Sequence, residues 1–208
     1  MSIKTRKGLA FSAFLFLVAC SMTSATLDSY VDANYSSGQI KRVVVLPITN
    51  TRLTVGQSTE LNRAFTQTLH QRNPSLAIVG SSEAVVKLNE ANLANDWAVF
   101  LANYSTSGIP DTKTVDRVGS ALNVDAIIQG SIVHIFQQDS MGWSYPITRV
   151  SVRYTMIGVK EGKVLWELTG EGKDQPYGYA ASPIFDAIKI AVYKILDAIP
   201  FYKQIKSK

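Results

Sequence analysis

Cysteine is almost absent from this sequence, because Cys20 is the only one in 208 residues. The chain therefore cannot form an internal disulfide or a metal site built from several cysteines. Histidine is nearly as rare, with only His70 and His134. Neither has other metal-binding residues around it at the spacing that zinc sites show. The sequence thus predicts no metal site and no bound cofactor, and it favours ordinary surface or core positions for both histidines.

The motifs of several common enzyme classes are also missing. The sequence contains no Gly-x-Ser-x-Gly, no phosphate-binding P-loop and no Gly-x-Gly-x-x-Gly. The loop 49–59, between a predicted strand and a predicted helix, could place an anion at the helix N-terminus, but an ordinary capped turn is the preferred interpretation. We expect a protein that is not an enzyme, since the paired acidic residues fall on predicted caps, turns and solvent faces: Asp111 with Asp116, and Glu161 with Glu167.

The N-terminal segment has the pattern of a secretory signal peptide. Its first eight residues carry Lys4, Arg6 and Lys7 and no acid, and an almost wholly apolar run follows over residues 9–19. A basic segment followed by roughly 7–15 apolar residues is typical of such signals. The run is shorter than the about 20 residues that a membrane-spanning helix needs. We therefore predict a signal peptide over residues 1–19.

The cysteine stands where this apolar run ends. Leu17-Val18-Ala19-Cys20 resembles the bacterial lipobox, Leu-x-small-Cys. The resemblance implies cleavage before Cys20 after its thiol has received a diacylglycerol, and usually acylation of the new amino terminus. A lasting anchor needs more than one chain, and a lipobox product has them. Acylation at Cys20 would make the protein a lipoprotein that palmitate labels. Enteric lipoproteins that stay at the inner membrane carry Asp at the next position, where this chain has Ser21. The resemblance therefore implies the periplasmic face of the outer membrane.

The formal net charge of +5 comes largely from the segment before Cys20. That segment holds three basic residues and no acidic one, so the chain from Cys20 onward is close to neutral. A basic surface for nucleic acid is therefore not expected, and neither is a nucleic-acid partner in the cell envelope. The expected partners are the membrane, through the lipid on Cys20, and an envelope protein. The oligomeric state stays open.

The rest of the chain divides into a linker and one domain. Residues 20–40, the lipidated cysteine and a stretch rich in Ser, Thr, Asn and Asp, are predicted to form a flexible tether. The domain is predicted over residues 41–208, and its opening strand is the apolar run from Val43 to Leu46. The further predicted elements are a helix bearing Leu61, Phe65 and Leu69 with Ser58 as its cap, a strand at 76–79, helices over Val85–Leu88, Trp97–Tyr104 and Val115–Leu122, a strand region at 125–138, a hairpin of strands at 149–156 and 164–168, and a helix from Ser182-Pro183 to Pro200.

These elements predict a mixed sheet. The β-α-β opening requires a parallel pair with a crossover connection, whereas two strands joined by the short turn at 160–163 are antiparallel. Helices must cover at least one face of such a sheet. The predicted fold class is therefore α/β, with a single domain.

Three segments resemble a known family in the expected order. "VVVLPITN" at 43–50, "ALNVDAIIQGSI" at 121–132 and "GVKEGKVLWE" at 158–167 resemble the opening, third strand and hairpin of periplasmic assembly lipoproteins with an α/β domain like the amino-terminal domain of TolB. The group includes the curli-secretion (CsgG-type) and penicillin-binding-protein activator lipoproteins. In this fold the resemblance assigns structural roles: close sheet packing at Gly130, a turn at Gly162, core filling by Trp166, and a left-handed residue at Asn123 in place of glycine.

The resemblance also implies a function. It predicts an outer-membrane lipoprotein acting as a non-catalytic accessory or adaptor in envelope assembly or secretion, through a protein partner. The alternatives are an oligomeric secretion channel of the curli type and an envelope enzyme without a recognisable motif. The aromatic stripe of Trp97, Phe100 and Tyr104 is expected in the core, whereas Trp143 and Tyr145 would mark a contact surface if their loop protrudes.

Overall fold

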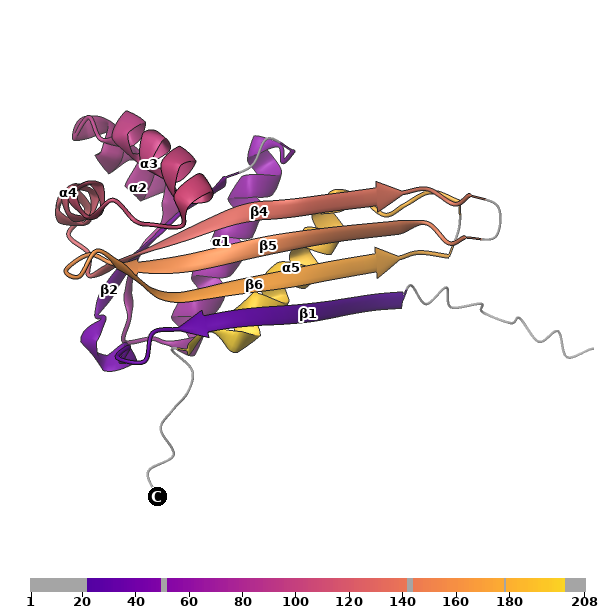
Figure 1. Ribbon diagram of the computed structural model, residues 1–208, viewed down its shortest axis with the longest axis horizontal. Helices are drawn as coiled ribbons and strands as arrows, with labels where there is room; N and C mark the ends of the chain where they lie inside the picture. The colour runs from indigo at the N-terminus through magenta and orange to yellow at the C-terminus, as the bar shows by residue number, and fades with distance from the viewer. Residues whose placement is uncertain (1–21, 50–51, 142–143, 178, 201–208) are drawn as a thin grey trace, which may run out of the picture.

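The computed structural model describes residues 22–49, 52–141, 144–177 and 179–200 (Figure 1). The predicted anchor Cys20 lies outside them. These residues form one α/β domain, as predicted, in which helices pack on a six-stranded mixed sheet. Its elements are β1 (Met22–Val31), the 3-10 helix η1 (Ser37–Gln39), β2 (Arg42–Thr49), α1 (Val55–Arg72), β3 (Ala77–Val79), α2 (Ser81–Glu90), α3 (Ala94–Ser107), α4 (Thr112–Leu122), β4 (Ala126–Gln138), β5 (Ile147–Gly158), β6 (Lys163–Gln175) and α5 (Ile184–Ala198).

The sheet combines a parallel half and an antiparallel half. Its strand order is β1-β6-β5-β4-β2-β3. Strand β2 runs parallel to both β3 and β4, while β4–β5, β5–β6 and β6–β1 are antiparallel pairs. The predicted β-α-β opening and the predicted hairpin are both confirmed.

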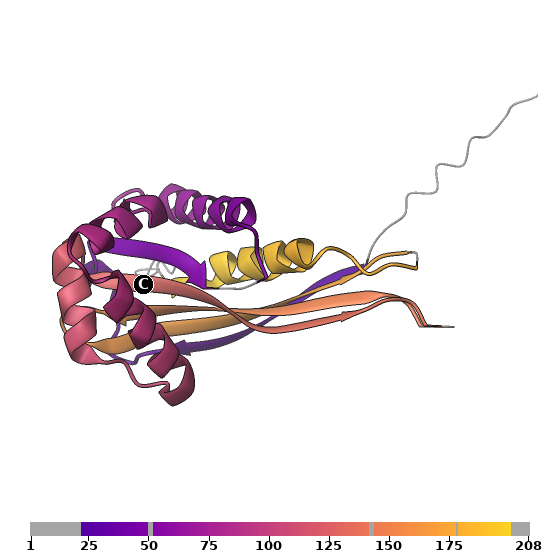
Figure 2. The same ribbon diagram turned by 90° about the horizontal axis from the view of Figure 1, so that it is seen from above.

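Helices cover the two faces of the sheet separately (Figure 2). One layer holds α1 and α5, and the other holds α2, α3 and α4. Strand β2 is apolar on both faces because both are covered: Val43 and Val45 face the first layer, and Val44 faces the second. Trp97 and Phe100 are buried in the second layer, so the aromatic stripe does belong to the core.

The predicted helix-end signals are confirmed at α4 but not at the starts of α1 and α5. Helix α5 begins at Ile184 with Pro183 as its N-cap, one residue later than Ser182-Pro183 predicts. Asp111 caps α4, and Asn123 ends it in the left-handed conformation with a φ of 52°. The prediction of Ser58 as the cap of α1 is wrong, because the helix begins one turn earlier. Thr54 accepts a hydrogen bond from the Gln57 N–H in a capping box, which satisfies the first-turn donors.

The structural roles inferred for three residues are confirmed. Trp166 is fully buried, and Gly162 has a left-handed φ of 60° in the turn between β5 and β6. At Gly130 a Cβ atom would lie 2.7 Å from the ring of Tyr154. The sheet therefore needs glycine there for the ring of Tyr154, which stacks on Phe65 of α1 with ring centroids 4.2 Å apart.

The flexible tether predicted over residues 20–40 is wrong for most of its length. Met22–Val31 is strand β1, which pairs with β6 from Met22 opposite Gln175 to Val31 opposite Trp166. The strand covers the edge of β6, and its Leu27 packs against the core. Only one face of β1 meets the domain, so its composition is mostly polar and looks like that of a linker.

Strands β5 and β6 are longer than predicted, β4 has close to its predicted length, and all three extend past α2, α3 and α4 (Figures 1 and 2). Strands β4 and β6 have 13 residues each and β5 has 12. Helix α5 lies along one face of this extension, while α2, α3 and α4 lie at the opposite end of the sheet on the other face. The long strands therefore present a sheet face that no helix covers.

Candidate functional site

The uncovered face of β1, β6, β5 and β4 carries mostly polar side chains. They alternate with the residues that face α5, such as Val150 and Val152 of β5, and the strand register places them side by side. We call this surface the open sheet face. It consists of Ser24, Thr26, Asp28 and Tyr30 of β1, Glu167, Thr169, Glu171 and Lys173 of β6, Arg149, Ser151 and Arg153 of β5, and Ser131, Val133, His134 and Phe136 of β4. Gln129 and Thr155 lie on the same side of the sheet but are buried next to α3.

Two ion pairs cross this face from β5 to β6. Arg149 Nε lies 3.3 Å from Glu171 Oε1, and Arg153 Nε lies 3.4 Å from Glu167 Oε1. Acidic and basic side chains therefore offset each other on the face, as the near-neutral charge of the chain after Cys20 predicts. A surface of this kind has no single sign of charge to attract a polyanion.

A bulge in β4 exposes apolar side chains beside these charges. The register between β4 and β5 shifts between Ile132 and His134, and such a shift re-aims the side chains next to it. Val133 is 49% exposed and Phe136 is 41% exposed. His134 is exposed in the same strand, which agrees with the surface position expected for a histidine without metal-binding neighbours.

A pocket of about 330 Å³ lies where the open sheet face meets α3. It combines apolar and hydrogen-bonding walls, and the residues that line it include Thr49, Leu101, Tyr104, Ser131, Val133 and Arg153. The pocket is large enough for one or two side chains of another molecule, and the exposed Val133 stands at its wall.

One wall of the pocket is held by Gln129. Its Nε2 donates to the carbonyl oxygens of Pro47 at 2.8 Å and Gly130 at 2.7 Å, and its Oε1 accepts from Trp97 Nε1 at 3.3 Å. Gln129, which makes all three contacts, is only 7% exposed. Because buried polar groups are stable only when they are hydrogen-bonded, this wall is pre-organised.

A second set of polar groups meets at Glu167. Its Oε2 accepts hydrogen bonds from Thr155 Oγ1 at 3.0 Å and from the Tyr104 hydroxyl at 3.5 Å, and its Oε1 faces Arg153. Burial, followed by the nearby Glu167 carboxylate, raises the pKa of the Tyr104 hydroxyl. Tyr104 therefore keeps its proton and acts as a donor. These groups form hydrogen bonds and an ion pair with one another, an arrangement expected of a rigid binding wall and not of an activated nucleophile.

Glu167 is the residue that the sequence analysis placed wrongly, on a solvent-exposed face without a role. Replacing it by glutamine is expected to lower the free energy of unfolding by roughly 1 kcal/mol, because the charged acceptor of two hydrogen bonds and an ion pair is lost. Glu171→Gln is the matched control on the same strand, and its single exposed ion pair with Arg149 contributes at most about 0.5 kcal/mol. Urea unfolding of both variants tests this, and equal losses would contradict the role given to Glu167.

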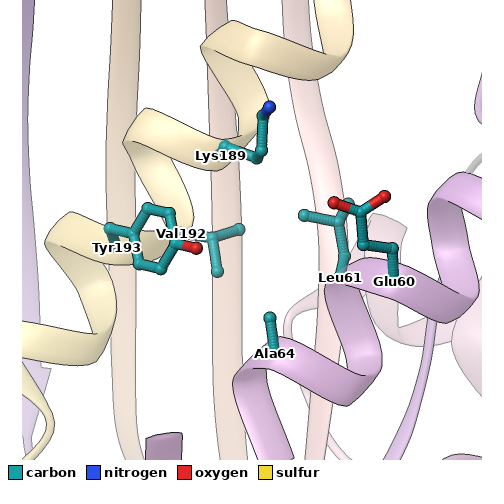
Figure 3. A pocket seen from close by; sticks show the side chains of 6 residues that line it. All are labelled: Glu60, Leu61, Ala64, Lys189, Val192 and Tyr193. Atoms are coloured by element: carbon teal, nitrogen blue, oxygen red, sulfur yellow. The ribbon is translucent and has the colours of Figure 1, made fainter.

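Two other hollows have simpler explanations. The groove between α1 and α2 measures about 820 Å³ and includes Thr54 in its lining. Thr54 already caps α1, as the preferred interpretation of a capped turn before this helix requires. Between α1 and α5 a notch of about 20 Å³ has room for about one water molecule. Figure 3 shows Glu60, Leu61 and Ala64 of α1 facing Lys189, Val192 and Tyr193 of α5 across this notch.

Two of the remaining candidate residues share a hollow and the other two lie elsewhere. Asp116 and Glu161 are exposed and line a hollow of about 670 Å³ together with Lys163. Asp111 is engaged in its helix cap, where the Thr114 hydroxyl lowers its pKa, and His70 is exposed on α1. Within the described part of the chain, no three His, Cys, Asp or Glu residues come together as a metal site would require.

Among the described residues, no helix has both the length and the apolar character that crossing a membrane requires.

Comparisons with known proteins give similar folds at low sequence identity. No protein-family model matches the chain, and no curated protein matches it. Among solved structures, the PelC dodecamer from Paraburkholderia phytofirmans is 17% identical with a TM-score of 0.45, covering 83% of this chain and 95% of that chain. Lipoprotein GNA1162 from Neisseria meningitidis is 13% identical with a TM-score of 0.37, covering 76% and 98%.

A third similar structure is the LpoB C-terminal domain from Escherichia coli. It is 12% identical with a TM-score of 0.35, and the alignment covers 64% of this chain and 81% of that chain. The structural neighbours thus include a bacterial lipoprotein. The resemblance to TolB and to the curli-secretion lipoprotein stays a prediction.

Proposed function

We propose that this chain is a lipoprotein of the bacterial outer membrane, anchored on the periplasmic face through Cys20, that serves as a non-catalytic accessory in envelope assembly or secretion. Its action is to bind a protein partner on the open sheet face. The observation that carries the proposal is a sheet that extends past its helices and leaves one face of β4, β5, β6 and β1 uncovered.

Two features of this face favour a protein over a small ligand. Val133 and Phe136 are exposed on β4, and Val133 lines a pocket of about 330 Å³. Protein interfaces are commonly centred on an apolar side chain inserted in such a pocket. The ion pairs of Arg149 and Arg153 with β6 lie on one side of this apolar strip. Polar groups beside an apolar centre are common in non-obligate interfaces.

The lipid anchor restricts where the partner is found. The lipobox-like segment ends at Cys20, and the domain begins at Met22 without the long tether that was expected. The open sheet face is therefore presented close to the membrane. A partner in the envelope, or one secreted across it, fits that position.

Replacing Phe136 by the photo-crosslinking residue p-benzoylphenylalanine is expected to yield a covalent adduct with the partner in cells. Tyr193 of α5, which is exposed on the helix-covered side, is the matched control position and should give no such adduct. Gel shifts and mass spectrometry of the irradiated protein measure both. Equal adducts at the two positions, or none at Phe136, would contradict the proposal, and an adduct of twice the chain mass would favour the oligomeric alternative.

A further inference from the structure

One end of the molecule gathers the ends of the long strands and the loops that join them. Met22 pairs with Gln175, and Gln138 pairs with Ile147, so the start of β1 lies beside the loop between β4 and β5 and the segment between β6 and α5 (Figure 1). We call this end the tip. It consists of Met22 and the described residues of 139–146 and 176–182.

Large side chains at the tip are exposed to solvent. Met141 is 71% exposed and Tyr179 is 89% exposed, and Met22, Tyr145 and Tyr177 are also more than half exposed. Tyr145 was expected to mark a contact surface if its loop protrudes, and its exposed ring meets that condition. Trp143 lies outside the described residues. Apolar and aromatic side chains gathered in water usually mark a binding surface.

Hydrogen bonds hold the two tip segments together. Ser140 N–H donates to the Tyr179 carbonyl oxygen at 2.9 Å, and Ala181 N–H donates to Asp139 Oδ1 at 2.9 Å. The rings of Tyr145 and Tyr177, one from each segment, meet edge to face with centroids 6.2 Å apart. The exposed rings are therefore presented by a connected structure and not by two independent loops.

The tip has almost no charge. Asp139 is the only acidic or basic residue in the sequence of 139–147 and 175–183, and one of its oxygens is engaged by Ala181. Tyrosine places an apolar ring in lipid while its hydroxyl stays in water, and it is enriched where proteins meet the bilayer surface. A surface with neither lysine nor arginine has no electrostatic attraction to anionic lipid.

The position of Cys20 in the sequence favours a bilayer over another protein as the partner of the tip. Cys20 precedes Met22 by two residues, so the Cα atoms of the two residues lie no more than about 8 Å apart. A lipid on Cys20 therefore holds the tip against the membrane from which it extends. Another protein would have to displace lipid from a surface that the anchor brings there.

We propose that the tip is a second membrane contact, in which the tyrosine and methionine side chains enter the headgroup region of the bilayer that holds the lipid of Cys20. The contact directs the long strands away from the membrane and keeps the open sheet face accessible. This inference rests on the lipid attachment proposed above. It adds a second contact, which fixes the orientation of the domain relative to the membrane.

Site-specific fluorescence tests the contact, because the sequence has no thiol except that of Cys20. Tyr179→Cys, in the lipidated full-length protein, is labelled with the environment-sensitive dye NBD and reconstituted in vesicles of phosphatidylethanolamine and phosphatidylglycerol. The expected result is a blue-shifted emission with a several-fold rise in intensity, quenched by lipids that carry a nitroxide near the headgroup. The signal should persist at high salt. Lys160→Cys, in the exposed turn at the opposite end of the sheet, should stay in water.

The labelling itself separates the two proposals. The unsubstituted protein takes up no dye if its Cys20 carries the lipid, whereas a free thiol there would overturn both the anchor and the tip contact. If the protein is lipidated and floats with the vesicles but the dye at position 179 behaves as it does at position 160, the tip contact alone is wrong. A dye at position 179 that becomes protected only when a protein partner is added would also overturn it.

Discussion

Replacing Gly172 by alanine is expected to lower the free energy of unfolding by roughly 2–3 kcal/mol, because α5 crosses β6 with no space for a side chain. A Cβ atom at this position would overlap the Ala187 carbonyl oxygen and lie 2.7 Å from the Ala191 nitrogen. Both neighbours are backbone atoms of α5, so the helix as a whole has to move. The nearby Gly170 makes the same close approach.

The loss is large because α5 supplies much of one core. Ala187, Ile188, Ala191, Ile195 and Leu196 of this helix are fully buried against the sheet. Lifting the helix by even a fraction of an ångström weakens the contacts of all of them at once. A loss of this size is a substantial part of the about 5–15 kcal/mol that stabilises a typical domain.

Gly56→Ala provides the matched control for this substitution. Gly56 lies in the first turn of α1, and the nearest heavy atom to its added Cβ is Thr54 Oγ1 at 4.0 Å. Alanine there should leave the stability unchanged or raise it by up to about 1 kcal/mol, since glycine is the poorer helix former. Chemical unfolding followed by circular dichroism measures both variants. A Gly172→Ala protein as stable as Gly56→Ala would show that α5 does not pack as described.

The sequence predicts the parts of the fold that depend on local patterns. The apolar run at 43–46 and the cap at Asp111 follow from residue chemistry within a few positions, and the structure confirms them. The left-handed position of Asn123, which the family resemblance implied, is confirmed as well. Strand β1 does not follow from such a pattern. Its inward residues Ala25 and Leu27 are separated by polar ones, and its pairing depends on β6, which lies more than a hundred residues later in the chain.

The candidate site was harder to predict for the same reason. Its polar groups form two sets: Gln129 of β4 binds Trp97 of α3, and Glu167 of β6 binds Tyr104 of α3 and Thr155 of β5. No spacing along the sequence connects the members of either set. Each alternating strand has polar residues at every second position. This pattern predicts a sheet face exposed to solvent, but it does not predict that residues of different strands line one pocket. Because the strand register is set by the whole sheet, the meeting of these residues becomes visible only in the structure.

Replacing Cys20 by serine is expected to abolish palmitate labelling and to remove the protein from the outer membrane. Serine lacks the nucleophilic thiolate that forms the thioether, so neither the diacylglycerol nor the subsequent acyl chain is added. Each buried methylene contributes about 0.8 kcal/mol to membrane binding. The tip offers only a few partly inserted side chains and no cation, so it orients a lipidated protein but does not hold one without lipid.

Intact-mass measurement and fractionation of the Cys20→Ser protein test this directly. The wild-type chain should show the mass of residues 20–208 plus that of its acyl chains, and the variant should lack the lipid mass. Ser21→Ala is the matched control, since it changes the neighbouring hydroxyl and leaves the thiol in place, and it should keep the label. Labelling of the Cys20→Ser protein would show that the lipid is elsewhere. The membrane would then no longer lie within about 8 Å of Met22, and the exposed side chains of the tip would need a protein as their partner.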